Sequence, residues 1–236
     1  GEQEYSIEDR RLLRDLVSQA GPAVRVAQRV LQHEAEPGDR QRLEQEWGVA
    51  GVIQQTLLPD QVPQLPGWQL NAFYRPARQM GGDYYDFVDL PGGRLGIFIG
   101  DVSGKGVPAE LVMATTRAIL RAAAEQIISP GEVLKRANDL LYPDILPMMF
   151  VTCLYAVLDP DNGRLLYANA GHDLPMHRSV DGTDELWATG MPLGLVPGST
   201  YEEEEIRLLP GECVLFYNDG LVEAHNSERE LFGLPR

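Results

Sequence analysis

Short apolar segments separated by tight-turn sequences fill the chain beyond Gly67 and constrain its fold more than any other feature. The turn sequence PGG at 91–93 separates two such segments, and DPDNG at 159–163 separates two more. Turn-forming residues between apolar runs are typical of β-hairpins. The pattern predicts mostly antiparallel sheets, with strands expected at 68–74, 84–90, 94–100, 149–158, 164–170, 202–208 and 212–217.

Two helices are expected between these groups of strands. One runs from Val107 to about 126 with Pro108 in its first turn, and the other covers 130–141, where Ser129 and Glu132 match a capping box. Helices inserted between runs of sequential hairpins indicate an α+β arrangement and not a parallel βαβ one.

The N-terminal quarter has the sequence pattern of helices instead. Apolar residues recur at helical spacing over 6–31, and a narrow apolar stripe follows, formed by Leu43, Trp47, Ala50, Ile53 and Leu57. The proline-rich stretch 59–66 reads as a link. We therefore expect a helical segment at 1–36, a linker with a signalling helix at 37–66, and a main domain at 67–236. The stripe should pack either on that domain or on its mate in a homodimer.

The charge balance excludes several classes of partner. The chain has 35 Asp and Glu against 20 Lys and Arg, a net charge of −15, which repels nucleic acid and anionic membrane surfaces. Its longest apolar run, 148–158, is too short to span a bilayer, and no signal sequence is evident, so we expect a cytoplasmic protein. Cys153 and Cys213 lie in strand-like runs and are expected in the core.

The candidate chemistry is carried by aspartates. Asp83 follows two glycines, Asp101 ends an apolar strand and opens GDVSGKG, and Asp219 ends another apolar strand before a glycine. An Asp after a strand is often only a turn former or helix cap. Three of them in this pattern, without His or Cys at zinc-ligand spacing, favour a site for Mg²⁺ or Mn²⁺.

Two nucleotide-binding interpretations of GDVSGKG can be checked against the sequence. A P-loop would need Gly at 99 and Ser or Thr at 106, where this chain has Ile99 and Gly106. A dinucleotide fingerprint is formally present as Gly104, Gly106 and Ala109, but the following sequence does not continue as a compact βαβ unit. A nucleotide-dependent kinase or oxidoreductase is therefore disfavoured. The chain also lacks a G-x-S-x-G serine elbow.

Taken in order, the motifs resemble those of the metal-dependent serine/threonine phosphatases of the 2C type, in the bacterial branch of stage II sporulation protein E and the sigma-factor regulators. The resemblance covers about 49–233 and rests on GGDYYDF, GDVSGKGVPAELVMA, NAGH at 169–172, GMPLGL, LLPGE and FYNDGLVEA. It implies a four-layer α-β-β-α sandwich with two Mn²⁺ or Mg²⁺ ions between the sheets. By motif position, Asp101 would bridge both ions beside the carbonyl of Val102, while Asp83 and Asp219 would each bind one.

The same resemblance implies the reaction. A metal-bound water, and no protein nucleophile, would attack a phosphoserine or phosphothreonine. Gly82, Gly104 and Gly106 would keep side chains out of the substrate mouth. The implied substrate is a small phosphorylated anti-sigma-factor antagonist of the STAS type, within sigma-factor partner switching. NAGH is a landmark without an assignable chemical role, and His172 is expected to be structural.

The chain departs from the family pattern near its end. Family members continue past the Phe232-Gly233 motif to a last strand that carries a further metal-binding aspartate, and this sequence ends at Arg236, so the domain at 67–236 is expected to lack that strand. One of the two ions is therefore expected to be weakly bound or missing. The alternative function is a regulatory binding module that has the phosphatase fold but little or no activity. Segment 6–31 resembles the closing helix of a GAF-type sensor domain.

Overall fold

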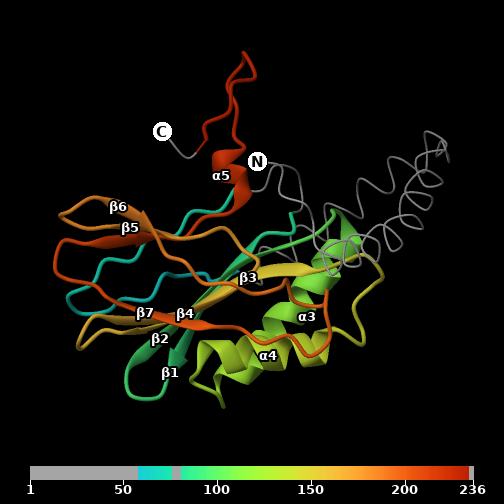
Figure 1. Cartoon of the computed structure of the whole chain (residues 1–236), viewed down its shortest axis with the longest axis horizontal. Coiled ribbons are helices and arrows are strands. Elements are labelled where there is room, and N and C mark those ends of the chain that lie inside the picture. The colour runs from blue at the N-terminus through green and yellow to red at the C-terminus, as the bar shows by residue number, and fades with distance from the viewer. Residues whose placement is uncertain (1–57, 76–80, 234–236) are drawn as a thin grey trace, which may run out of the picture. The chain divides into compact units, whose positions relative to one another are not determined.

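The computed structural model describes residues 58–75 and 81–233 (Figure 1). By internal contacts the chain divides into two compact units, Gly1–Glu46 with Leu146–Met148 and Trp47–Ile145 with Met149–Arg236, and every element described below belongs to the second. The N-terminal helices and the apolar stripe lie outside the described residues, so the domain boundaries stay predictions. No helix in the described part of the chain is long and apolar enough to cross a bilayer.

The larger sheet has five antiparallel strands in the order β1-β2-β3-β4-β7. Its two hairpins, β1-β2 and β3-β4, confirm the predicted turns at 91–93 and 159–163. The edge strand β7 begins within the glutamate run at 202–205. The strands are β1 (Tyr84–Leu90), β2 (Arg94–Val102), β3 (Val151–Asp159), β4 (Arg164–Ala170) and β7 (Glu203–Arg207).

The smaller sheet has three short antiparallel strands in the order β6-β5-β8. They are β5 (Met176–Arg178), β6 (Thr183–Glu185) and β8 (Cys213–Leu215). Only β8 falls in a strand expected from the sequence. The other two have three residues each and no apolar alternation, so sequence periodicity cannot reveal them.

Helices α3 (Val107–Ala124) and α4 (Pro130–Leu141) confirm the two predicted helices, and α5 (Asp219–Val222) adds a single turn. Ser129 caps α4 as predicted, because its Oγ accepts a hydrogen bond from the Glu132 backbone N–H at 3.2 Å. Figure 1 shows α3 and α4 together on one side of the five-stranded sheet and the smaller sheet on the other.

Two hydrophobic cores hold these layers together. One packs α3 and α4 against the larger sheet, through residues such as Met113, Leu134 and Val151. The other lies between the two sheets and includes Leu154 and Val214. This arrangement confirms an α+β fold with two antiparallel sheets. The described helices supply one outer layer, so the second helical layer of a four-layer sandwich stays a prediction.

Two local expectations are wrong. Residues 68–74 form no strand: Trp68 and Leu70 pack into the core between the sheets, and Trp68 Nε1 donates to the carbonyl of Pro160 at 3.0 Å, but no backbone ladder forms. Cys153 is buried as expected, whereas Cys213 is exposed because β8 turns its middle residue, Val214, toward the core.

A buried carboxylate ties β1 to α3. Asp86 is 2% exposed, and its Oδ2 lies 2.7 Å from Arg121 Nη1 and 3.0 Å from Arg117 Nε. Its Oδ1 accepts from the Phe87 backbone N–H at 2.9 Å. Asp86 is therefore a structural residue, although it stands only three positions after Asp83 in GGDYYD.

Candidate metal centre

Strand register brings Asp83 next to Asp101. In the β1-β2 hairpin Tyr84 pairs with Gly100, so Asp83, directly before β1, stands opposite Asp101 near the end of β2. Val102 is the last residue of β2, and its backbone N–H donates to the carbonyl of Gly82 at 3.3 Å. The hairpin thus gathers the first two predicted acidic ligands at one end of the sheet.

Asn218 connects the third aspartate to this pair. Its side-chain amide donates to Asp83 Oδ1 and to the carbonyl of Gly100, the latter at 3.3 Å. Asp219, the next residue, is the first residue of α5. A residue from the far end of the described chain therefore fixes the segment that carries Asp219 against β1 and β2.

The three carboxylates repel one another. Burial, followed by the negative charges of Asp83 and Asp219, raises the pKa of Asp101 to about 7. Burial and the charge of Asp219 also raise the pKa of Asp83, although the hydrogen bond from Asn218 opposes this shift. Such a concentration of negative charge favours a bound cation.

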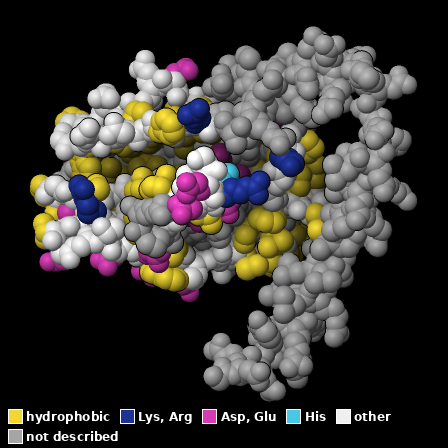
Figure 2. Space-filling view, turned by 90° about the horizontal axis from the view of Figure 1, so that it is seen from above, with side chains coloured by type: hydrophobic (Ala, Val, Ile, Leu, Met, Phe, Trp, Pro, Cys, Tyr) yellow, Lys and Arg dark blue, Asp and Glu magenta, His cyan; other side chains and the backbone are white. Residues whose placement is uncertain are grey.

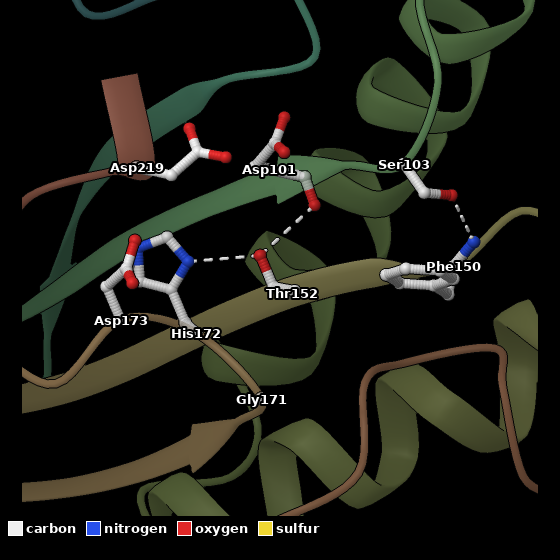
Figure 3. A pocket seen from close by; sticks show the side chains of 8 residues that line it. All are labelled: Asp101, Ser103, Phe150, Thr152, Gly171, His172, Asp173 and Asp219. Carbon is white, nitrogen blue, oxygen red and sulfur yellow. Dashed lines mark hydrogen bonds between the residues drawn. The ribbon is translucent and has the colours of Figure 1, made fainter. Parts of the chain in front are cut away.

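A pocket opens beside these residues and contains two of the three predicted ligands. Asp101 and Asp219 belong to its lining, as Figure 3 shows, whereas Asp83 does not. Figure 2 shows acidic and basic side chains close together on the face seen from above. Sequence reasoning did not select five other lining residues, which are Ser103, Phe150, Thr152, Gly171 and Asp173.

The NAGH segment has a structural explanation. Asn169 Oδ1 accepts from the His172 backbone N–H at 2.7 Å, and Asn169 Nδ2 donates to the His172 carbonyl at 2.9 Å. The His172 ring is buried, and this burial lowers its pKa to about 4. The neutral ring lies between Thr152 and the backbone of Tyr217.

The three predicted mouth glycines differ in their surroundings. A Cβ on Gly82 would lie 2.5 Å from the carbonyl oxygen of Val102 and 2.6 Å from Asp101 Oδ1. Gly104 and Gly106 have φ angles of 97° and 81°, which favour glycine, and a Cβ on either would meet nothing within 4 Å. Close packing requires glycine at 82, whereas backbone conformation requires it at 104 and 106.

The donor set fits a hard divalent cation in its chemistry. It combines three carboxylates with the nearby carbonyl of Val102, all of them oxygen donors. Within residues 58–75 and 81–233, no group of three His, Cys, Asp or Glu side chains converges on a single ion position. Adjustment of the carboxylate rotamers would therefore accompany metal binding.

Gly82→Ala should weaken metal binding, because the added methyl group would displace the Asp101 side chain or the Val102 carbonyl. Gly220→Ala is a matched control, since a Cβ there meets nothing within 4 Å. Calorimetric titration with Mn²⁺ should show at least about tenfold weaker binding for Gly82→Ala, the range expected when support of a ligand is lost. Equal affinities of the two variants would contradict this account of Gly82.

The sequence matches a known protein family and two characterised relatives. The pattern of the family described as Stage II sporulation protein E (SpoIIE) matches residues 91–236. The chain is 34% identical over 224 residues to Protein IcfG of Synechocystis, covering 83% of this chain and 35% of that protein. It is 34% identical over 194 residues to the phosphoserine phosphatase RsbU of Bacillus subtilis, covering 81% and 58% respectively. The chain thus spans between about a third and three fifths of these relatives.

Solved structures share the fold. The RsbU and RsbW domains of Rv1364c from Mycobacterium tuberculosis align with a TM-score of 0.56 at 31% identity, over 66% of this chain and 43% of that one. The PP2C domain of SiaA from Pseudomonas aeruginosa aligns with a TM-score of 0.70 at 22% identity, over 85% and 81%. RsbX, solved in complex with magnesium, aligns with a TM-score of 0.52 at 17% identity, over 65% and 72%.

Proposed function

This chain belongs to the stage II sporulation protein E (SpoIIE) family, and on that premise we propose that it is a metal-dependent protein serine/threonine phosphatase. The observation that carries the proposal is the placement of Asp83 opposite Asp101 by the β1-β2 register, with Asn218 holding the segment of Asp219 against them. Two of these carboxylates face an open pocket, where a phosphorylated side chain could reach them (Figure 3).

Asp101, the Val102 carbonyl, Asp83 and Asp219 are the proposed ligands of two Mn²⁺ or Mg²⁺ ions. When bound, divalent ions would supply activation of water and compensation of phosphoryl charge. The magnesium complex of RsbX supports the choice of a hard cation through the shared fold. Gly104 and Gly106, where a Cβ would meet nothing within 4 Å, are proposed to keep side chains out of the substrate entrance of the site.

The pocket residues of this chain favour attack by water over attack by a side chain. Ser103 Oγ accepts from the Phe150 backbone N–H at 2.8 Å, and none of its described contacts is with a base. Both nitrogens of His172 already face Thr152 and the Tyr217 carbonyl. Water would therefore form the new bond to phosphorus as the serine or threonine oxygen leaves.

The proposed substrate is a phosphorylated anti-sigma-factor antagonist of the STAS type. The relatives named phosphoserine phosphatase RsbU and RsbP support phosphoserine as the reacting group. Removal of that phosphate would change sigma-factor partner switching, a cytoplasmic process. The strongly acidic chain, with a net charge of −15, makes nucleic acid and anionic membranes unsuitable partners.

The test is a phosphatase assay of the chain with a phosphorylated STAS-domain antagonist, with and without Mn²⁺. We expect metal-dependent release of phosphate and no labelled phosphoenzyme. Binding of the antagonist without turnover, at saturating Mn²⁺, would instead support the alternative, a regulatory module with the phosphatase fold.

The apolar stripe that contains Trp47 is proposed to form a homodimer through the N-terminal helices. Trp47→Glu would place a charge in that stripe, so it should convert a dimer into a monomer. Sedimentation velocity measures the change, and Gln45→Glu is the control, because it introduces the same charge two positions away and off the stripe. An unchanged sedimentation coefficient for Trp47→Glu would exclude this interface.

A further inference from the structure

His172 connects two parts of the chain that carry proposed metal ligands. Its Nδ1 lies 3.1 Å from Thr152 Oγ1, and its Nε2 lies 3.1 Å from the carbonyl oxygen of Tyr217. Thr152 is the β3 partner of Asp101 on β2, and its hydroxyl reaches the Asp101 carbonyl at 3.4 Å (Figure 3). Tyr217 stands two residues before Asp219. The imidazole therefore bridges from the backbone at Asp101 to the segment that delivers Asp219.

The hydrogen-bonding groups define the state of the ring. A carbonyl oxygen can only accept, so Nε2 of His172 carries a hydrogen and donates it to Tyr217. The Thr152 hydroxyl has one hydrogen, which is donated either to Nδ1 or to the Asp101 carbonyl, and the β2-β3 pairing keeps Thr152 beside Asp101 in both cases. Both nitrogens are engaged within the protein, which leaves neither to exchange a proton with substrate.

The neighbouring residues hold the ring in place. The Asn169 side chain makes two hydrogen bonds to the backbone of His172. Gly171 has a φ of 72°, and a Cβ on it would lie 2.8 Å from Pro192 Cγ. Asn169 and Gly171 of the NAGH motif thus fix the position of His172.

We propose that His172 is a positioning residue that sets the separation of Asp101 from Asp219, and thereby the affinity of the site for a divalent cation. The part that concerns the cation rests on the proposed function. The positioning itself concerns only groups of this chain and can be measured without metal.

Two substitutions separate positioning from proton transfer. His172→Leu removes both hydrogen bonds. His172→Gln keeps one acceptor and one donor on a single planar group, yet cannot act as an acid or base near neutral pH. Thr152→Val removes one end of the bridge and leaves the histidine in place. His177→Gln, on β5 with a 3.2 Å contact to Glu212, is the matched control.

Calorimetric titration with Mn²⁺ should show 10- to 100-fold weaker binding for His172→Leu, roughly the range for loss of an outer partner of a metal ligand. Thr152→Val should be weakened less, and His172→Gln should return close to the wild-type affinity. Wild-type affinity in a folded His172→Leu variant would overturn the proposal. A His172→Gln variant as weak as His172→Leu would overturn it in favour of a role that only imidazole can fill.

Metal-free hydrogen exchange keeps this test separate from the proposed function. In His172→Leu, the amides of Leu221 and Glu223, which donate to Asn218 and Asp219, should exchange at least about tenfold faster, while those of α4 keep their rates. Unchanged exchange at 221 and 223 would overturn the proposal even if the wild-type chain is an active phosphatase. If the wild-type chain neither binds Mn²⁺ nor releases phosphate, the proposed function fails while the exchange result still decides the role of His172.

Discussion

Asp101→Asn should reduce phosphate release by more than about a hundredfold, beyond the usual cost of changing an outer partner of a metal ligand. The proposed bridging role needs two anionic oxygens, and an amide supplies one neutral oxygen donor. The fold should survive, because the side chain that is changed is crowded by the charges of Asp83 and Asp219 and loses that repulsion. Steady-state assays at saturating Mn²⁺, together with a thermal melt, measure both effects.

The neighbouring aspartates should behave differently. Asp83→Asn and Asp219→Asn each remove a ligand from one proposed ion, so raised Mn²⁺ should partly restore their activity. Asp139→Asn, an exposed change on α4, is the control and should match the wild type. Wild-type turnover by Asp101→Asn would reject the assignment of this residue.

Asp86→Ala should lower the free energy of unfolding by about 3 kcal/mol, the low end of the cost of breaking a buried ion pair. The low end applies because the partner Arg121 is partly exposed, with 37% of its side-chain surface accessible. The variant would leave the guanidinium groups of Arg117 and Arg121 without their carboxylate partner between β1 and α3. Urea denaturation in the absence of metal measures the loss.

Asp89 provides the matched control, because it lies on the same strand and is exposed. Asp89→Ala should change the free energy of unfolding by less than about 0.5 kcal/mol. A double-mutant cycle of Asp86 with Arg121 should show strong coupling between the two residues. Additive effects would mean that Asp86 stabilises the fold through something other than this ion pair.

The hairpins and the longer helices could be predicted from sequence because their signals are local. Turn residues at 91–93 and 159–163 and the cap at Ser129 each act over a few positions. Strands β5 and β6 pair with each other across a short turn, and β5 also pairs with the distant β8, but three residues each are too few to show a periodic pattern. The segment at 68–74 has strand-like residues, but only Trp68 and Leu70 pack on the core between the sheets, and the segment has no strand partner.

The same division applies to the site. Asp83, Asp101 and Asp219 stand at strand ends or beside glycines, which sequence reasoning can recognise. Thr152 lies in the pocket because the β2-β3 register places it beside Asp101, and Asp173 lies there because the chain after β4 runs past the same site. No local sequence pattern encodes either placement. Asp86 shows the converse, since its sequence neighbourhood is that of Asp83 but the alternation of β1 turns it toward α3.

The β1-β2 hairpin also affects how the protein reaches its native state. Asp83 and Asp101 are joined by one hairpin, whereas Asp219 comes from the far end of the described chain. Contacts between residues close in sequence require less loop-closure entropy and form faster than distant ones. We therefore expect the two mutually repelling carboxylates to meet before the third arrives, and their repulsion to oppose closure of the hairpin. A divalent ion that screens this pair would act on the kinetics of folding as well as on the finished site.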